Sequence, residues 1–248
     1  MDMTPYYNQM VEEALSGFKR LNNTTQVEHK KWEIPIATWE VNVVRGKVLE
    51  KATVSLVTLN TKHPETGEDT RFHALQAKVY PASPKIPILI FIIEHMTASD
   101  EFFSGMMDVI PAVSIAEDLS FLGAEMKKVA EKHGEDYEAL RHKGAQIFKL
   151  PLWDKPINAG VGIHNPTAKE RVDMIKEEGQ VWLKSYFKIV EKRLNEPYGN
   201  QDLEVMNVVR RRVLEYYYVG DISLRIANQM GVPLEAINLM LLAPTLHY

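Results

Sequence analysis

Two apolar runs in the middle of the chain carry three ionisable residues. The run IPILIFII leads directly into Glu94 and His95, and the run FFSGMMDVI contains one acid, Asp108. An acid among apolar side chains is destabilising unless it is paired, hydrogen-bonded or neutral, and perturbed acids gather at functional sites. We therefore take Asp108, Glu94 and His95 as candidate catalytic residues. Asp108 has an alternative role, because Asp commonly caps a tight turn and Pro111 follows closely.

Basic side chains occur within segments that alternate as strands do. We take Lys51, Arg71 and Lys78 as candidate substrate-binding residues, because a cation beside a cleft suits a ligand that carries carboxylates, and the fork of Arg binds one in bidentate fashion. The alternative for each of them is a place on a solvated strand face. His164 ends the glycine-broken run INAGVGIH, where it either faces a cleft or accepts a backbone hydrogen bond.

The sequence does not predict a metal or nucleotide cofactor. Its eight histidines are scattered, and the adjacent pair Glu94 and His95 would point to opposite faces of a strand. The chain has no cysteine, which excludes disulfides, thiolate zinc ligation and a cysteine nucleophile. The glycine-rich nucleotide motifs, H-E-x-x-H and G-x-S-x-G do not occur.

The overall composition is ordinary for a globular protein. The 248 residues are 45% hydrophobic and 25% charged, with a formal net charge of -4, so no nucleic-acid partner is expected. The first residues lack the basic and then apolar pattern of a signal peptide, and IPILIFII is too short to span a bilayer. We expect a cytoplasmic protein without a membrane partner.

Alternating segments in the first half predict a sheet, and amphipathic segments in the second half predict helices. The segment 32–44 alternates in two halves that are out of phase, which suits a bulge or bend. Because the connections between strands are short, the strands should form an antiparallel meander. Further predicted strands are 48–60, 71–80, 86–93 and 102–110, with 157–164 as an additional candidate. The predicted helices are 4–18, 114–134, 135–148, 167–194, 201–218 and 221–230, and the chain closes with the apolar segment 233–242. No linker or repeat divides the chain, so we predict one α+β domain over residues 1–248.

Several segments, in this order, resemble the oxygen-dependent coproporphyrinogen III oxidases. GKVLEKATVSL is similar to the family's G-x-V-F-E-K-A-G-V, FSGMMDVIP to its F-G-G-G-x-D-L-T-P, and NAGVGIHNP to its R-G-I-G-G-I-F-F-D-D. The closing PLEAINLMLLAPTLHY follows the family's last block. The resemblance covers roughly residues 32–248. It implies a large antiparallel β-sheet flanked by α-helices on both faces, assembled as a homodimer.

The resemblance also implies a chemistry: oxidative decarboxylation of two propionate side chains of a tetrapyrrole to vinyls, with O2 and without a metal or organic cofactor. Asp108 stands where the family's Asp is proposed to bind or deprotonate pyrrole N–H groups. Gly105 lies in the glycine run before that Asp, where the backbone can approach a ligand closely. The family's central strand presents His, Asn and Arg to the substrate, and Ile90, Ile92 and Glu94 stand there in this chain.

Two alternative functions remain open. One is a ferredoxin-dependent bilin reductase, whose L-H-x-x-x-F-P, P-x-F-G-x-D and D-L-S-P motifs are similar to LQAKVYP, PILIFIIEHM and DVIP; Gln76 would replace its histidine and Glu94 lies near its acid. The other is a dimeric tetrapyrrole carrier that binds its ligand without chemistry. The apolar segment INLMLLAP either covers a neighbouring subunit or belongs to the internal core.

Overall fold

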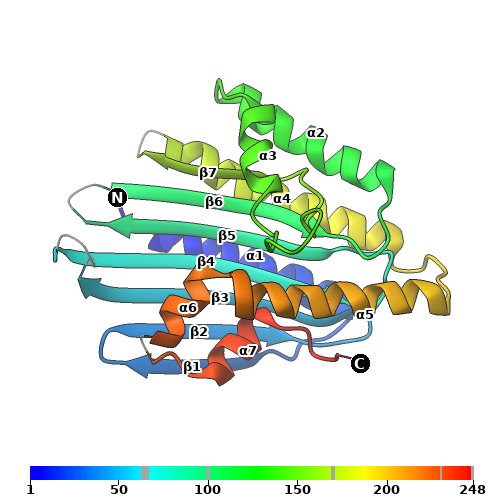
Figure 1. The fold of residues 1–248 in the computed structure, drawn as a ribbon, viewed down its shortest axis with the longest axis horizontal. Coiled ribbons are helices and arrows are strands. Elements are labelled where there is room, and N and C mark those ends of the chain that lie inside the picture. The colour runs from blue at the N-terminus through cyan, green and yellow to red at the C-terminus, as the bar shows by residue number, and fades with distance from the viewer. Residues whose placement is uncertain (63–66, 99–100, 169–170, 230, 247–248) are drawn as a thin grey trace.

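The centre of the molecule is a seven-stranded antiparallel sheet whose strands are arranged in chain order (Figure 1). The computed structural model describes residues 1–248 except 63–66, 99–100, 169–170, 230 and 247–248. The strands are β1 (Glu28–Ile34), β2 (Ala37–Val44), β3 (Leu49–Lys62), β4 (Asp69–Pro81), β5 (Ile88–Thr97), β6 (Glu101–Ile110) and β7 (Ile163–Ala168). The predicted meander and the α+β class are confirmed, and the sheet is not closed into a barrel.

Helices cover both faces of this sheet, as expected. They are α1 (Thr4–Asn22), α2 (Ala116–Lys132), α3 (Tyr137–Ala145), α4 (Val172–Arg193), α5 (Asn200–Glu215), the π-helical turn η2 (Tyr216–Gly220), α6 (Ile222–Gln229) and α7 (Leu234–Leu241). In Figure 1, α1 lies behind the sheet, whereas α5, α6 and α7 lie in front of it. No helix in the described part of the chain is long and apolar enough to cross a membrane.

Two hydrophobic cores result, one on each face of the sheet. We call the face that packs against α1 and α4 the N-side face, and the face that packs against α5, η2, α6 and α7 the C-side face. Side chains alternate between the faces along each strand. On β5, for example, Phe91 and Ile93 belong to the N-side core, whereas Ile88 and Ile90 belong to the C-side core. The face on which a residue lies therefore follows from its place in the alternation.

Three strand boundaries differ from the sequence prediction. The out-of-phase segment 32–44 is not one bent strand: it is the second half of β1, a turn at 35–36, and β2. The predicted strand 86–93 continues to Thr97, because Glu94 and His95 pair with Ser104 and Phe103 of β6. The candidate strand 157–164 is extended and paired only from Ile163 onwards.

Candidate functional site

Asp108 is a buried residue of β6 whose carboxylate fixes the segment that precedes β7. It faces the C-side of the sheet opposite Ile90, and its exposed fraction is 1%. One oxygen, Oδ1, accepts the Val109 N–H at 2.8 Å, and Oδ2 accepts Nδ2 of Asn158 at 2.7 Å and the Gly160 N–H at 3.0 Å. Burial raises the pKa of Asp108 and these hydrogen bonds oppose the increase. Its carboxylate is thus already bound by groups of its own chain.

Glu94 lies on the same C-side face but is only half-buried. Within the described residues, no hydrogen bond reaches its carboxylate. Burial raises the pKa of Glu94 to about 7, and the negative charge of Asp221 adds to this increase. Near neutral pH this carboxyl group can therefore both accept and release a proton, which suits general acid–base chemistry.

Lys51 and Lys78 also lie on the C-side face, on β3 and β4, and both are buried. The ammonium of Lys51 donates to the backbone carbonyls of Asn238, at 3.1 Å, and Leu242, so it is bound by the C-terminal end of α7. The ammonium of Lys78 has no hydrogen-bond partner in the described part of the molecule. Burial lowers the pKa of both lysines to about 7.

His164 lies on β7 opposite Met106, again on the C-side face, and is half-buried. Among the described residues, no group forms a hydrogen bond to its Nδ1 atom, which is buried. Burial lowers the pKa of His164, the positive charge of Lys143 adds to this, and a hydrogen bond with the Gly105 backbone opposes it. His164 therefore lies on the same face as Asp108 and Glu94, and its Nδ1 is without a partner among the described residues.

His95 and Arg71 lie on the other face of the sheet. The ring of His95 stacks on Phe103 with centroids 4.5 Å apart, and its Nε2 is 3.0 Å from an Oε1 of Glu101. Arg71 is exposed at the open end of the sheet and lines a surface pocket of about 740 Å³ there. Seven positions separate Arg71 from Lys78 on β4, and an odd separation places two strand residues on opposite faces. The structure therefore does not bring His95 or Arg71 together with Asp108, which lies on the C-side face.

Gly105 also faces the N-side of the sheet. Its N–H donates to Oδ1 of Asn165 at 3.1 Å, and a Cβ atom built there would lie 2.8 Å from the same oxygen and 3.6 Å from Glu178. Nδ2 of Asn165 in turn donates to Glu178 at 2.8 Å. Gly105 therefore permits close packing of β6 against β7 and α4, and it does not line the C-side face.

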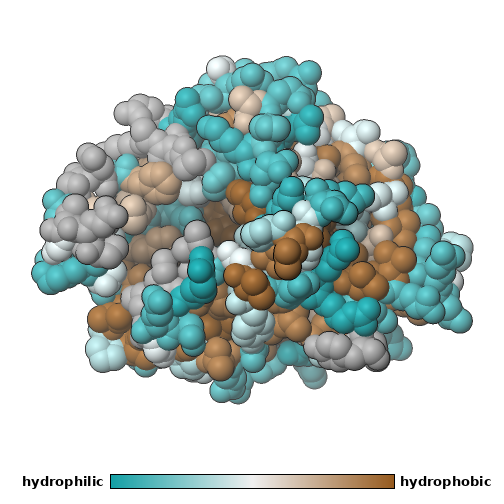
Figure 2. Space-filling view, in the orientation of Figure 1, coloured by the Kyte–Doolittle hydropathy of each residue, from teal (hydrophilic) through white to brown (hydrophobic). Residues whose placement is uncertain are grey.

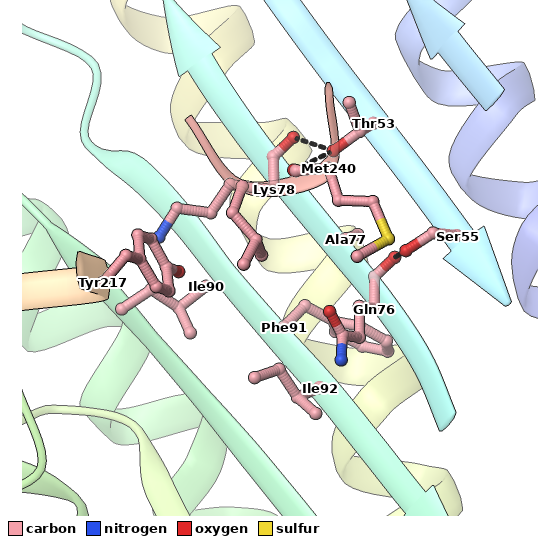
Figure 3. Close-up of a pocket in the computed structure, with 11 residues that line it drawn as sticks. Thr53, Ser55, Gln76, Ala77, Lys78, Ile90, Phe91, Ile92, Tyr217 and Met240 are labelled. Atoms are coloured by element: carbon pink, nitrogen blue, oxygen red, sulfur yellow. Dashed lines mark hydrogen bonds between the residues drawn. The ribbon is translucent and has the colours of Figure 1, made fainter. Parts of the chain in front are cut away.

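A hollow lies on the C-side face between α3 and α6 (Figure 2). Half-buried residues on the C-side face of the sheet are Gln76 on β4, Ile92 and Glu94 on β5, and His164 on β7. A small cavity of about 10 Å³ lies between the sheet and the C-terminal helices (Figure 3), and its lining includes Gln76, Lys78 and Ile92. That volume suffices for one water molecule. A ligand much larger than water therefore does not fit in this cavity as it stands.

Sequence reasoning missed the residues that enclose Lys78. The rings of Phe148 and Tyr217 approach its ammonium from segments far away in the chain. Tyr217 belongs to a run of three tyrosines that is conspicuous in the sequence, but no pattern there connects residue 217 with residue 78. No group of three or more His, Asp or Glu residues that could hold a metal ion occurs in the described ranges.

The fold and the site define an α+β protein with ionisable residues along one face of an open antiparallel sheet. A family model described as Coproporphyrinogen III oxidase matches residues 2–248. The chain therefore belongs to the coproporphyrinogen III oxidase family.

Curated relatives carry the same family name at low sequence identity. The chain is 24% identical to the oxygen-dependent coproporphyrinogen-III oxidase of Coxiella burnetii strain Dugway 5J108-111 in an alignment of length 264 that covers 96% of this chain and 84% of that protein. It is 23% identical to the enzyme of the same name from Rickettsia bellii in an alignment of length 221 that covers 82% of this chain and 78% of the relative. The Drosophila melanogaster enzyme is 23% identical in an alignment of length 195 that covers 73% of this chain and 50% of that protein.

Proposed function

We propose that this protein is a tetrapyrrole-handling enzyme that decarboxylates propionate side chains of a coproporphyrinogen with O2. The observation that carries the proposal is the family match over residues 2–248. The hollow on the C-side face supports it, because this is the face that holds Asp108, Glu94, Lys78 and His164. A tetrapyrrole with propionate arms offers N–H donors at its centre and carboxylates at its edge, and this face offers acids and cations.

The proposed reaction balances without a resident cofactor. Each propionate loses one hydrogen from the carbon next to the pyrrole ring, and the bond to its carboxylate breaks to release CO2. The two remaining carbons become a vinyl group. O2 takes up the two electrons and two protons and leaves as H2O2. The protein then has to orient the tetrapyrrole, hold the pyrrole N–H groups and assist proton transfer.

We assign the contact with pyrrole N–H groups to Glu94. Its carboxylate is half-buried on the C-side face and has no hydrogen bond within the described residues, and a carboxylate is well suited to accept several N–H donors. Asp108, which is bound to Asn158 and Gly160, is given a positioning role. It holds the segment that leads to His164 against the edge of the sheet.

The assembly and the location of the protein are part of the proposal. The homodimer is expected from the family resemblance alone, because the segment INLMLLAP forms α7 and packs on its own sheet, with Ile237 and Met240 buried. Light scattering at two protein concentrations tests the dimer, and a concentration-independent monomer would exclude it. We also expect a cytoplasmic enzyme. Ferredoxin would be required only by a bilin reductase, which no observation favours over the oxidase.

The test is aerobic incubation of the purified protein with coproporphyrinogen III, followed by mass spectrometry of the products. The expected products have lost one or two CO2 units with two hydrogens each, and omission of O2 should prevent their formation. Glu94→Gln, which keeps the shape of the side chain, should lower the rate by about 100-fold or more. The matched control is Glu33→Gln, which changes an acid on the exposed edge strand β1. Binding of the tetrapyrrole without product above the no-protein control would contradict the enzyme and favour a carrier.

A further inference from the structure

Lys78 is a buried cation without a hydrogen-bond partner. Its exposed fraction is 3%, and none of its three ammonium protons is donated to any group in the described part of the chain. Lys51, one strand away, shows the usual solution, because its ammonium donates to two carbonyls of the α7 end. An unpartnered ammonium in the interior is costly. The negative charge of Asp221 offsets part of this cost but accepts no hydrogen bond from the ammonium, so the N–H donors are left available to a ligand.

Aromatic rings partly compensate this charge. The ammonium lies 5.1 Å from the ring centre of Tyr217, 5.7 Å from that of Phe148 and 6.0 Å from that of Tyr80. Cation–π attraction of this kind stabilises the charged form without using its N–H donors. The three donors thus remain free for an anion, and a carboxylate is the anion that a tetrapyrrole with propionate arms supplies.

The position of Lys78 relative to the open hollow also suits a propionate. Lys78 pairs with Ile90, and Glu94 lies four residues further along β5 on the same face. At the rise of a strand and the spacing between neighbouring strands, their Cα atoms are roughly 14 Å apart. Gln76 and Ile92 lie between them on the same face, and both line the cavity next to Lys78. A macrocycle whose N–H groups lie over Glu94 would direct a propionate arm along β4 towards Lys78.

Only two short segments separate Lys78 from incoming ligand. The small cavity is lined by Lys78, Tyr217 and Met240 among others, so η2 and α7 form its wall opposite the sheet (Figure 3). The wall is not a continuous α-helix at this point, since Tyr217 belongs to a π-helical turn at the end of α5. Single π turns frequently occur at functional sites. A shift of Tyr217 and Met240 away from the sheet would join the cavity to the hollow.

We propose that Lys78 binds a carboxylate of the tetrapyrrole substrate, with Tyr217 and Met240 moving aside to admit it. This inference rests on the proposed function, because it assumes a tetrapyrrole in the hollow. It assigns the recognition of the propionate to an ammonium enclosed by aromatic rings on β4. It also predicts that the protein distinguishes tetrapyrrole acids from their esters.

The test compares coproporphyrin III, the stable oxidised form with free carboxylates, with its tetramethyl ester in the same detergent buffer. Dissociation constants come from quenching of tryptophan fluorescence. The wild-type protein should bind the acid more tightly than the ester. Lys78→Met, which keeps the length of the side chain and removes its charge, should weaken binding of the acid by about 10-fold to 100-fold and leave the ester unchanged. Lys128→Met removes an exposed lysine of α2 and should alter neither constant.

Two results would overturn the inference: Lys78→Met binds the acid as tightly as the wild type does, or the wild type binds neither compound. Circular dichroism verifies that each variant is folded. Decarboxylation of coproporphyrinogen III, measured separately, tells the two proposals apart. Acid-selective binding through Lys78 without vinyl products contradicts the proposed reaction and leaves the carboxylate site standing. If the wild-type protein forms vinyl products but Lys78→Met binds coproporphyrin III as tightly as the wild type does, the proposed reaction stands and the carboxylate site is contradicted.

Discussion

The ammonium of Lys78 lies 5.1 Å from the centre of the Tyr217 ring, so a residue of the central sheet meets the π-helical turn of the C-terminal layer at a buried charge. The ammonium is a poorly satisfied polar group of the C-side core, because it donates no hydrogen bond to any described residue. A group retained at such a cost typically trades stability for function. The cost itself can be measured.

Lys78→Met should stabilise the protein, most strongly at neutral and acidic pH. Burial lowers the pKa of Lys78 to about 7 in the folded state, against an ordinary value of 10.5. Between these values the unfolded chain binds more protons, so stability rises with pH there and the full penalty is present below pH 7. We expect Lys78→Met to gain about 1–3 kcal/mol at pH 6 and less at pH 9.5. Urea unfolding at the two pH values measures this, and a less stable variant at pH 6 would contradict it.

Glu178→Gln should reduce a pH dependence of the opposite sign, in which the stability of the wild-type protein falls as pH rises. Glu178 is fully buried in α4, accepts only Nδ2 of Asn165 among the described residues, and burial raises its pKa to about 8. Because the folded protein keeps this proton up to pH 8 while the unfolded chain loses it near pH 4.5, stability falls across that range. The variant should gain about 1–3 kcal/mol at pH 8 relative to pH 5. An unchanged slope would mean that Glu178 is ionised in the folded protein. Glu94, whose pKa is also raised, contributes a slope of the same sign, so the total is reduced and not abolished.

Gly162→Ala should disrupt the junction between β6 and β7. A Cβ atom at this position would lie 1.7 Å from the carbonyl oxygen of Met107 and 2.9 Å from Cα of Asp108, both of them backbone atoms that have little room to move. We expect a loss of about 3 kcal/mol in unfolding free energy. Gly199→Ala, where a Cβ atom meets nothing within 4 Å, is the control and should cost only about 1 kcal/mol or less, because Gly199 is the N-cap of α5 and Ala caps less well than Gly. Equal stability of the two variants would argue against this packing of the junction.

Hydroxyl groups of the sheet hold α7 in place, and their removal should loosen that helix. Tyr80 donates to the carbonyl of Leu241 at 2.5 Å, and Thr53 donates to that of Met240 at 3.0 Å. Tyr80→Phe combined with Thr53→Val should speed hydrogen exchange of the α7 amides by about 10-fold or more, since each lost bond contributes about 1 kcal/mol. Mass spectrometry of peptides that cover α7 measures this.

The control for this exchange experiment is Tyr137→Phe. Its hydroxyl also donates to a backbone carbonyl, that of Val161 at 2.7 Å, but Tyr137 belongs to the N-side core and is remote from α7. Exchange in α7 should remain at the wild-type rate in this variant. If the double variant also leaves α7 protected, its attachment does not depend on these hydroxyls.

Local rules predicted the sheet well and the site only in part. Short connections gave the meander, and alternation placed Glu94 and His95 on opposite faces, as observed. The same alternation places Arg71 and Lys78 on opposite faces of the sheet. Both were predicted to bind the substrate, and that prediction did not take the odd separation between them into account. The end of β5 was wrong because backbone pairing with β6 carries a strand beyond its apolar run. Strand propensity alone does not contain that pairing.

The surroundings of Asp108 and Lys78 could not be read from the sequence. The carboxylate of Asp108 is bound by Asn158, fifty positions away, and its role in fixing that segment differs from the turn cap suggested by Pro111. Tyr217 reaches Lys78 across a still longer separation. Such contacts depend on how α5 and η2 cross the sheet, which is decided by packing of the whole C-side core.

The order of the layers has a consequence for synthesis of the protein. The sheet and its N-side helices are encoded before residue 199, whereas α5, η2, α6 and α7 follow it. A nascent chain emerging from the ribosome can therefore close its N-side core while apolar C-side residues such as Trp39 and Ile90 are still bare. During that interval the bare sheet is a natural target for chaperones. A stop codon within α5 would leave it uncovered permanently, and the product would be prone to aggregate.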